Sequence, residues 1–332
     1  MSVIYHREAI DDVINDPNEK DTLKEKLRLV KSIRQYATRT LYLPDNKSYL
    51  YYTDLKRPYV VWNVFSAPEF SLKPINWCYP IIGCVSYRGY FDKQNAQDYA
   101  QTLSDEGHDI YVAGIAAYST LGWFNDPFLS SMIHWRDRSL AGLIFHELSH
   151  QVIYVSNETA FNEAFSSAVE RIGSLQWLLD TNPTGVEHYM KYLYAQGEFR
   201  DLLLQTKNEL EVLYASDASI EVKRDRKELV FRALRVRYEQ LKKSWPENIH
   251  FDYWFKQPIT NARFIASMTY LDKIPAFYAL FVQSNGSWQD FYRKIIEIGE
   301  MEKSERDELI SHSLQKQNAL PEILALLKKQ QL

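Results

Sequence analysis

The spacing of apolar residues predicts a β-containing first half of the chain. In residues 7–39 apolar side chains recur at helical spacing, which predicts a long helix. Residues 48–65 alternate in polarity and are rich in Tyr and Val, which predicts a hairpin of two strands. Further strands are expected at residues 81–87 and 110–117. A helix over residues 92–106 lies between them in the sequence.

The second half of the chain has a longer, helical periodicity. Residues 139–155 and 158–180 are expected to form two helices, because the turn-forming pair Ser156-Asn157 interrupts the apolar pattern between them. Two long charged helices are expected over residues 186–215 and 219–243. Shorter helices follow to the C-terminus.

Together these elements predict an α+β fold. A β-containing lobe, residues 1–137, would precede a helical lobe, residues 138–332, and the two would form one integrated catalytic unit. The chain has 332 residues, of which 45% are hydrophobic and 25% are charged. That length and composition allow a globular protein with a substantial buried core.

Charge and hydropathy exclude several classes of function. The net charge of −4 does not indicate nucleic acid or an anionic membrane as a partner. The basic run 223–243 is interleaved with acidic residues, as on the solvated face of a packed helix. No apolar stretch reaches 18 residues, so no transmembrane helix is expected. The N-terminus has no signal-peptide pattern, so the protein is cytoplasmic or its export signal is absent from this chain.

The chain has two cysteines, Cys78 and Cys84. Their spacing matches no zinc-finger pattern, and two residues cannot form a disulfide framework. We expect two buried thiols. A single bridge closing a small loop is the alternative, and it would indicate an oxidising compartment.

The clearest chemical signal is the motif H-E-x-x-H, formed by His146, Glu147 and His150. On a helix, positions i and i+4 lie on one face, so both imidazoles reach one metal ion while Glu147 can act as general base on a water molecule. The alternative is an exposed helix that carries these residues by chance. Apolar residues around the motif favour a buried helix, which gives metal ligands a rigid support.

A catalytic zinc site needs a third protein ligand and an open position. Three carboxylates on or near the following helix are available: Glu158, Glu163 and Glu170. Glu163 and Glu170 share a helix face about 10 Å apart along the axis, so only one of them can be a ligand. The other would accept a hydrogen bond from a ligand histidine or contact the substrate.

The residues from His146 to His150, followed by Asn162-Glu163-Ala164-Phe165, resemble the gluzincin pattern, H-E-x-x-H and then N-E-x-F. This resemblance implies one Zn²⁺ per chain, with Glu163 as the third ligand and Glu170 as its neighbour seven residues later. It also implies a zincin-like fold, with a small mixed sheet beside the H-E-x-x-H helix and a large helical C-terminal part.

Five other stretches resemble a bacterial family of predicted aminopeptidases, so that the similarity covers nearly the whole chain. The stretches lie at residues 58–63, 77–80, 83–91, 117–124 and 261–263. Members of that family commonly carry an N-terminal signal or lipoprotein segment, which this chain lacks. The resemblance implies a zinc peptidase of the cell envelope or periplasm.

Peptide hydrolysis on zinc requires a donor for the oxyanion of the tetrahedral intermediate. Tyr118, Arg263 and Tyr270 are the candidates, and Tyr118 and Arg263 lie in stretches that resemble the family. An aminopeptidase also needs a carboxylate for the substrate ammonium, and Glu170, Glu69 and Glu158 are available. The strand expected at residues 109–118 could pair with the substrate backbone.

The predicted function is therefore zinc-dependent removal of N-terminal residues from peptides, with peptide as the partner. Two alternatives stay open. One is an endopeptidase of the envelope, which would need an open cleft. The other is a non-catalytic envelope protein held together by zinc, although such a protein has no need of the base Glu147.

Overall fold

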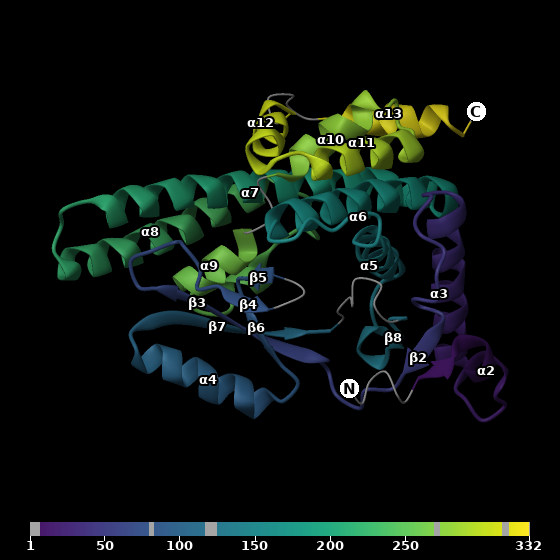
Figure 1. Ribbon diagram of the computed structural model, residues 1–332, viewed down its shortest axis with the longest axis horizontal. Coiled ribbons are helices and arrows are strands. Elements are labelled where there is room, and N and C mark those ends of the chain that lie inside the picture. Colours follow the sequence, from purple (N-terminus) through teal and green to yellow (C-terminus); the bar gives the residue numbers. More distant parts are fainter. Residues whose placement is uncertain (1–6, 80–82, 117–124, 269–272, 314–318, 332) are drawn as a thin grey trace. The chain divides into compact units, whose positions relative to one another are not determined.

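The structure is a computed structural model, and its secondary structure confirms the α+β class: mostly helices, with small sheets (Figure 1). The residues that it describes are 7–79, 83–116, 125–268, 273–313 and 319–331.

The chain divides into two compact units, each built from discontinuous segments. Unit 1 comprises residues 1–61, 114–186 and 273–332, and unit 2 comprises residues 62–113 and 187–272. Each unit contains chain from both sides of residue 137. The two predicted lobes therefore do not coincide with the two compact units.

Unit 1 carries the H-E-x-x-H motif in a helical assembly. Its helices are α2 (Ile10–Asn15), α3 (Asp21–Arg39), α5 (Asp137–Ser149), α6 (Thr159–Thr181), α10 (Ile274–Gln283), α11 (Trp288–Glu300), α12 (Lys303–Ser313) and α13 (Leu320–Lys329). Short 3-10 turns lie at Ser130–Met132 and Pro183–Gly185. Helix α6 packs against α5, α10 and α13, and α5 also packs against α3.

A small mixed sheet belongs to the same unit. Strand β2 (Tyr51–Thr53) pairs antiparallel with β1 (Glu8–Ala9) and parallel with β8 (Phe128–Leu129). The predicted hairpin over residues 48–65 is therefore wrong, because β2 pairs within this sheet while β3 (Val61–Pro68) belongs to another. The alternation of polarity identified both strands, but it carries no information about their partners.

Two predicted helices are shorter than expected. The run 7–39 is split into α2 and α3, because Pro17 has no N–H to donate and keeps Asp16 extended. Helix α5 ends at Ser149, so residues 151–158 form a loop where the sequence predicted helix up to residue 155. We call this segment the 151–158 loop.

Unit 2 contains a second sheet and the long helices. Its sheet has the order β6–β3–β7, with β6 at Arg88–Tyr90 and β7 at His108–Ile115. Its helices are α4 (Lys93–Asp105), α7 (Val186–Ala215), α8 (Ile220–Leu241) and α9 (Asn261–Met268), with 3-10 turns at Lys242–Ser244 and Asp252–Phe255. The side chain of Asp92 caps α4, and Ser219 caps α8, as their positions at the predicted helix starts favour.

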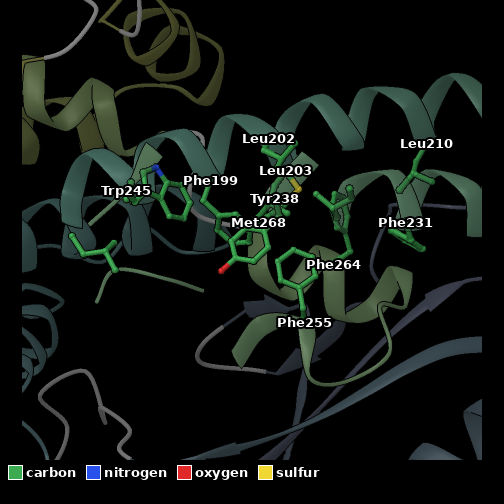
Figure 2. Packing of buried hydrophobic residues seen from close by; sticks show 13 residues of the cluster. Phe199, Leu202, Leu203, Leu210, Phe231, Tyr238, Trp245, Phe255, Phe264 and Met268 are labelled. Carbon is green, nitrogen blue, oxygen red and sulfur yellow. The ribbon is translucent and has the colours of Figure 1, made fainter. Parts of the chain in front are cut away.

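The core of unit 2 is aromatic. Phe199 of α7, Tyr238 of α8 and Phe255 pack in one cluster with Phe264 of α9 (Figure 2). A smaller cluster forms where Trp62 and Val64 of the sheet meet Ala96 and Ala100 of α4. The many aromatic residues are thus used largely for packing.

The two cysteines form a disulfide, contrary to the prediction of two thiols. Strand β4 (Trp77–Tyr79) pairs antiparallel with β5 (Gly83–Val85), and this register places Cys78 directly opposite Cys84. A cross-strand pair of cysteines lies close enough to bond, which the spacing in the sequence alone did not reveal. Within the described part of the chain, no helix is both long and apolar enough to cross a membrane.

Candidate metal centre

Helix α5 presents the motif from a buried support. Leu140, Ile144, Phe145 and Leu148 are fully buried in the core of unit 1. His146 and Glu147 are only partly exposed, and His150, the residue that caps the end of the helix, is buried. The apolar residues therefore fix the helix while its ionisable residues share one side, as the sequence pattern predicted.

Two glycines allow α5 and α6 to approach closely. A Cβ atom on Gly142 of α5 would lie 3.1 Å from Glu170 Cγ, and a Cβ on Gly173 of α6 would lie 3.0 Å from Phe145 Cδ2. Gly142 precedes His146 by about one helical turn. Because Gly142 has no side chain, the Glu170 side chain can lie against its backbone. Close helix packing thereby brings the carboxylates of α6 to the histidines of α5.

Three side chains converge on one point between these helices. Glu163 Oε2 lies 3.2 Å from His146 Nε2, and Glu163 Oε1 lies 3.5 Å from His150 Nε2. One ligand atom from each residue lies within 4.8 Å of those from the other two. His146, His150 and Glu163 could therefore hold a metal ion, and we call them the ligand group.

The outward nitrogens of both histidines have partners of their own. His150 Nδ1 lies 3.0 Å from Oγ of Ser166, which is completely buried. His146 Nδ1 lies 3.4 Å from Glu170 Oε2. When Nδ1 donates its proton to these oxygens, Nε2 is left as the unprotonated nitrogen that faces Glu163.

Glu170 thus lies behind His146, away from the point on which the ligand group converges. This position corresponds to the partner role that the sequence assigned to one of the two carboxylates. Glu163, and not Glu170, contacts the Nε2 atoms of both histidines.

The charges of the ligand group are strongly coupled. Burial opposes the charged form of His146, but its hydrogen bonds to Glu163 and Glu170 raise its pKa well above the ordinary value. Burial lowers the pKa of His150 to about 4. Burial raises the pKa values of Glu163 and Glu170. The hydrogen bond that each carboxylate accepts from His146 outweighs burial, so both pKa values are lowered. These shifts favour the charged form of His146 and of the two carboxylates in the metal-free protein.

Glu147 is poised for proton transfer. Its pKa is raised to about 7, mainly by burial. The carboxylates of Glu163, Asp126 and Glu170 also raise this pKa, and the charge of His146 lowers it. A carboxyl group with such a pKa can both take up and give back a proton near neutrality.

The three oxyanion donors proposed from the sequence differ in what the structure describes of them. Tyr118 and Tyr270 lie outside the described residues. The guanidinium of Arg263, in unit 2, donates to the backbone carbonyls of Trp254, Gln257 and Pro258. These bonds give Arg263 a role in closing the loop before α9.

The remaining two carboxylates are engaged in ion pairs. Glu69, in unit 2, forms a bidentate pair with Arg224 at 2.6 and 2.9 Å. Glu158, in unit 1, pairs with Lys303 at 2.6 Å and with Arg306 at 3.4 Å. Glu158 therefore ties the start of α6 to α12.

Sequence reasoning missed three residues around the ligand group. Ser166 follows Glu163 by three positions and so lies on the same helix face, which a helical projection could have revealed. The sequence pattern identified Asn162 only as the first residue of the N-E-x-F motif, without a role of its own. Tyr154 follows His150 in the 151–158 loop, and burial together with the charge of Glu163 raises its pKa. Its electrostatic coupling to Glu163 became visible only in the folded chain.

Comparison with known proteins assigns the chain to a family. A family model described as putative aminopeptidase matches residues 1–310. The chain belongs to this family. The match extends over both compact units and includes the entire ligand group, and membership supports a function of the peptidase type. No curated protein and no solved structure matches the chain.

Proposed function

We propose that the protein is a zinc-dependent aminopeptidase, and that the ligand group His146, His150 and Glu163 carries its metal. The observation that supports this most directly is the convergence of two Nε2 atoms and one carboxylate on a single point. Two imidazoles and one carboxylate are a donor set suited to zinc, with a fourth position open for water. Membership of the putative aminopeptidase family supports the same activity.

Zinc held by these residues would supply a Lewis acid that polarises the scissile carbonyl and makes water more acidic. Glu147 would take a proton from the attacking water and deliver it to the leaving amine. Its pKa of about 7 in the metal-free protein suits both steps. Ser166 and Glu170 would keep the two Nε2 atoms directed at the metal.

The hydroxyl of Tyr154 would donate a hydrogen bond to the developing oxyanion. Tyr154 is partly exposed, and its phenol is electrostatically coupled to Glu163 of the ligand group. The raised pKa keeps the phenol protonated, as a hydrogen-bond donor requires. Arg263 is a weaker candidate for this role, since its donors hold backbone carbonyls.

The disulfide supports a location in an oxidising compartment. Disulfides persist in the periplasm and outside cells, and they are rare in the cytosol of most organisms. The Cys78–Cys84 bond therefore favours the periplasm or cell envelope as the site of action.

The test combines metal analysis with one substitution. Wild-type protein should hold one zinc ion per chain and should cleave peptides with a free N-terminus in preference to N-acetylated copies. Glu147→Gln keeps the shape of the side chain and removes the base, so zinc content should persist while turnover falls roughly 10²- to 10⁴-fold. Wild-type turnover by fully zinc-loaded Glu147→Gln protein would refute the mechanism. Equal cleavage of acetylated peptides would indicate an endopeptidase.

A further inference from the structure

The ligand group comes from α5, its C-cap residue His150 and α6, and the 151–158 loop connects these two packed helices. His150 ends one helix, and Glu163 lies in the first turns of the next. A flexible loop would allow Glu163 to move relative to the histidines. Helix packing brings the three ligand atoms together, and the way the loop is held contributes to keeping them in place.

The loop is fixed by one side chain of α6. Asn162 Oδ1 accepts a hydrogen bond from the backbone N–H of Val155 at 2.9 Å, and Asn162 Nδ2 donates to the backbone oxygen of Val155 at 2.8 Å. Asn162 is 1% exposed, so water does not compete for these bonds. A single amide thus pairs with both polar backbone groups of one loop residue, as a neighbouring strand would.

Further contacts hold the same loop from its other side. Val155 Cγ2 and Ile153 Cδ1 both lie against Gly299 of α11, where a Cβ atom would collide with Ile153. The backbone N–H of Glu158 donates to the oxygen of Val155 at 3.2 Å, and Asn157 has a φ of 63° in the turn between them. Val155 is therefore the point at which the loop is attached to both α6 and α11.

The position of Asn162 in the sequence connects this attachment to the ligand group. Glu163 follows Asn162 directly, and Tyr154 precedes Val155 directly. The amide of Asn162 consequently joins the Tyr154–Val155 segment to the residue that contacts both Nε2 atoms. An aspartate could replace only the acceptor, and its second oxygen would face the carbonyl of Val155.

We propose that Asn162 is a positioning residue for the ligand group, which holds Glu163 and Tyr154 in register through both backbone groups of Val155. This proposal rests on the proposed function. It assigns to Asn162 an effect on zinc affinity that a loss of stability alone does not produce. Asn162 itself contacts neither metal nor substrate.

The experiment compares two buried amides on the same helix. Asn162→Leu removes both hydrogen bonds and keeps the size of the side chain. The control is Gln176→Met, because Gln176 is also buried in α6 and its Oε1 accepts a bond from Trp288 Nε1 at 2.6 Å. Gln176 is about 21 Å further along the helix axis, so its loss should leave the ligand group unchanged.

Three quantities are measured for each variant: the melting temperature, the zinc Kd by chelator competition, and hydrogen exchange of the Val155 amide in metal-free protein. Both substitutions should lower the melting temperature. Asn162→Leu should weaken zinc binding at least tenfold and accelerate exchange at Val155, as expected for loss of a residue that orients a metal ligand. Asn162→Asp keeps the acceptor for the Val155 N–H, so its zinc Kd should lie between those of the wild type and Asn162→Leu.

The outcomes separate this proposal from the proposed function. Gln176→Met should keep its zinc Kd within about twofold, because lower stability alone changes Kd only through the folded fraction. An unchanged Kd in Asn162→Leu, or equal weakening in Gln176→Met, would overturn the positioning role while leaving the peptidase intact. If neither Asn162 variant folds, Asn162 serves folding and the proposal is wrong. Failure of the wild type to bind zinc would refute the proposed function instead. Exchange at the Val155 amide would still show whether the hydrogen bonds of Asn162 hold the loop.

Discussion

Metal binding should displace one proton, and that proton should come from His146. In the metal-free protein the bonds to Glu163 and Glu170 keep the pKa of His146 well above its ordinary value, although burial opposes this. Burial keeps the pKa of His150 near 4. A metal ligand must be unprotonated, so zinc competes with a proton on His146 but not with one on His150 above about pH 5.

Proton release from His146 makes the zinc Kd depend on pH. Below the pKa of His146, each rise of one pH unit should tighten zinc binding tenfold, or about 1.4 kcal/mol. Because the pKa of His146 lies well above its ordinary value, the Kd should continue to fall above pH 7. Two histidines with ordinary pKa values of 6.5 would instead give roughly a 16-fold change that levels off above pH 7.

The assay should use the Glu147→Gln variant. The pKa of Glu147 is about 7, so a nearby cation would release a proton from it and add to the slope. Chelator competition between pH 6 and pH 8, corrected for protonation of the chelator, gives the Kd at each pH. Glu170→Gln in the same background replaces a charged acceptor of His146 with a neutral one and should move the end of the slope to lower pH. A plateau above pH 7 in the Glu147→Gln protein would refute the assignment of the proton to His146.

Two further predictions concern the surroundings of the ligand group. Glu163→Ala should weaken zinc binding more than Glu170→Ala, because Glu163 contacts both Nε2 atoms and Glu170 only one Nδ1. For Glu170→Ala a loss of about 10- to 100-fold is expected. The reverse order in a chelator titration would identify Glu170 as the ligand. Tyr154→Phe should lower kcat about 10²- to 10³-fold, the cost of losing one oxyanion donor, with KM and zinc content nearly unchanged. Tyr36→Phe is the matched control, since the pKa of Tyr36 is also raised by burial and a carboxylate, Asp180, and that variant should retain its kcat.

The candidate site could be predicted from the sequence to the extent that it depends on local helix geometry. The spacing of His146 and His150 fixes their common face whatever the rest of the fold does. The positions of the long helices α7 and α8 followed for the same reason, and Ser219 in addition caps the start of α8. The resemblance to gluzincins also selected Glu163, the carboxylate that the structure brings to both histidines.

Contacts between distant segments could not be predicted in this way. Helix α5 ends at Ser149, and the backbone of Val155 bonds to the side chain of Asn162, a partner that a periodicity continuing to residue 155 does not reveal. The partners of β2 come from residues 8–9 and 128–129, which no local pattern identifies. The disulfide likewise depends on the register of β4 and β5.

The division of unit 1 into three separate segments has a consequence for biosynthesis. Helix α6, which carries Glu163, packs against α10 and α13, and both belong to the last segment, residues 273–332. The entire helical part of unit 2 must be synthesised before that segment leaves the ribosome. A nascent or truncated chain can therefore contain His146, Glu147, His150 and Glu163 without their native packing. Maturation of the site is accordingly a late event, and it depends on residues that follow the motif by more than a hundred positions.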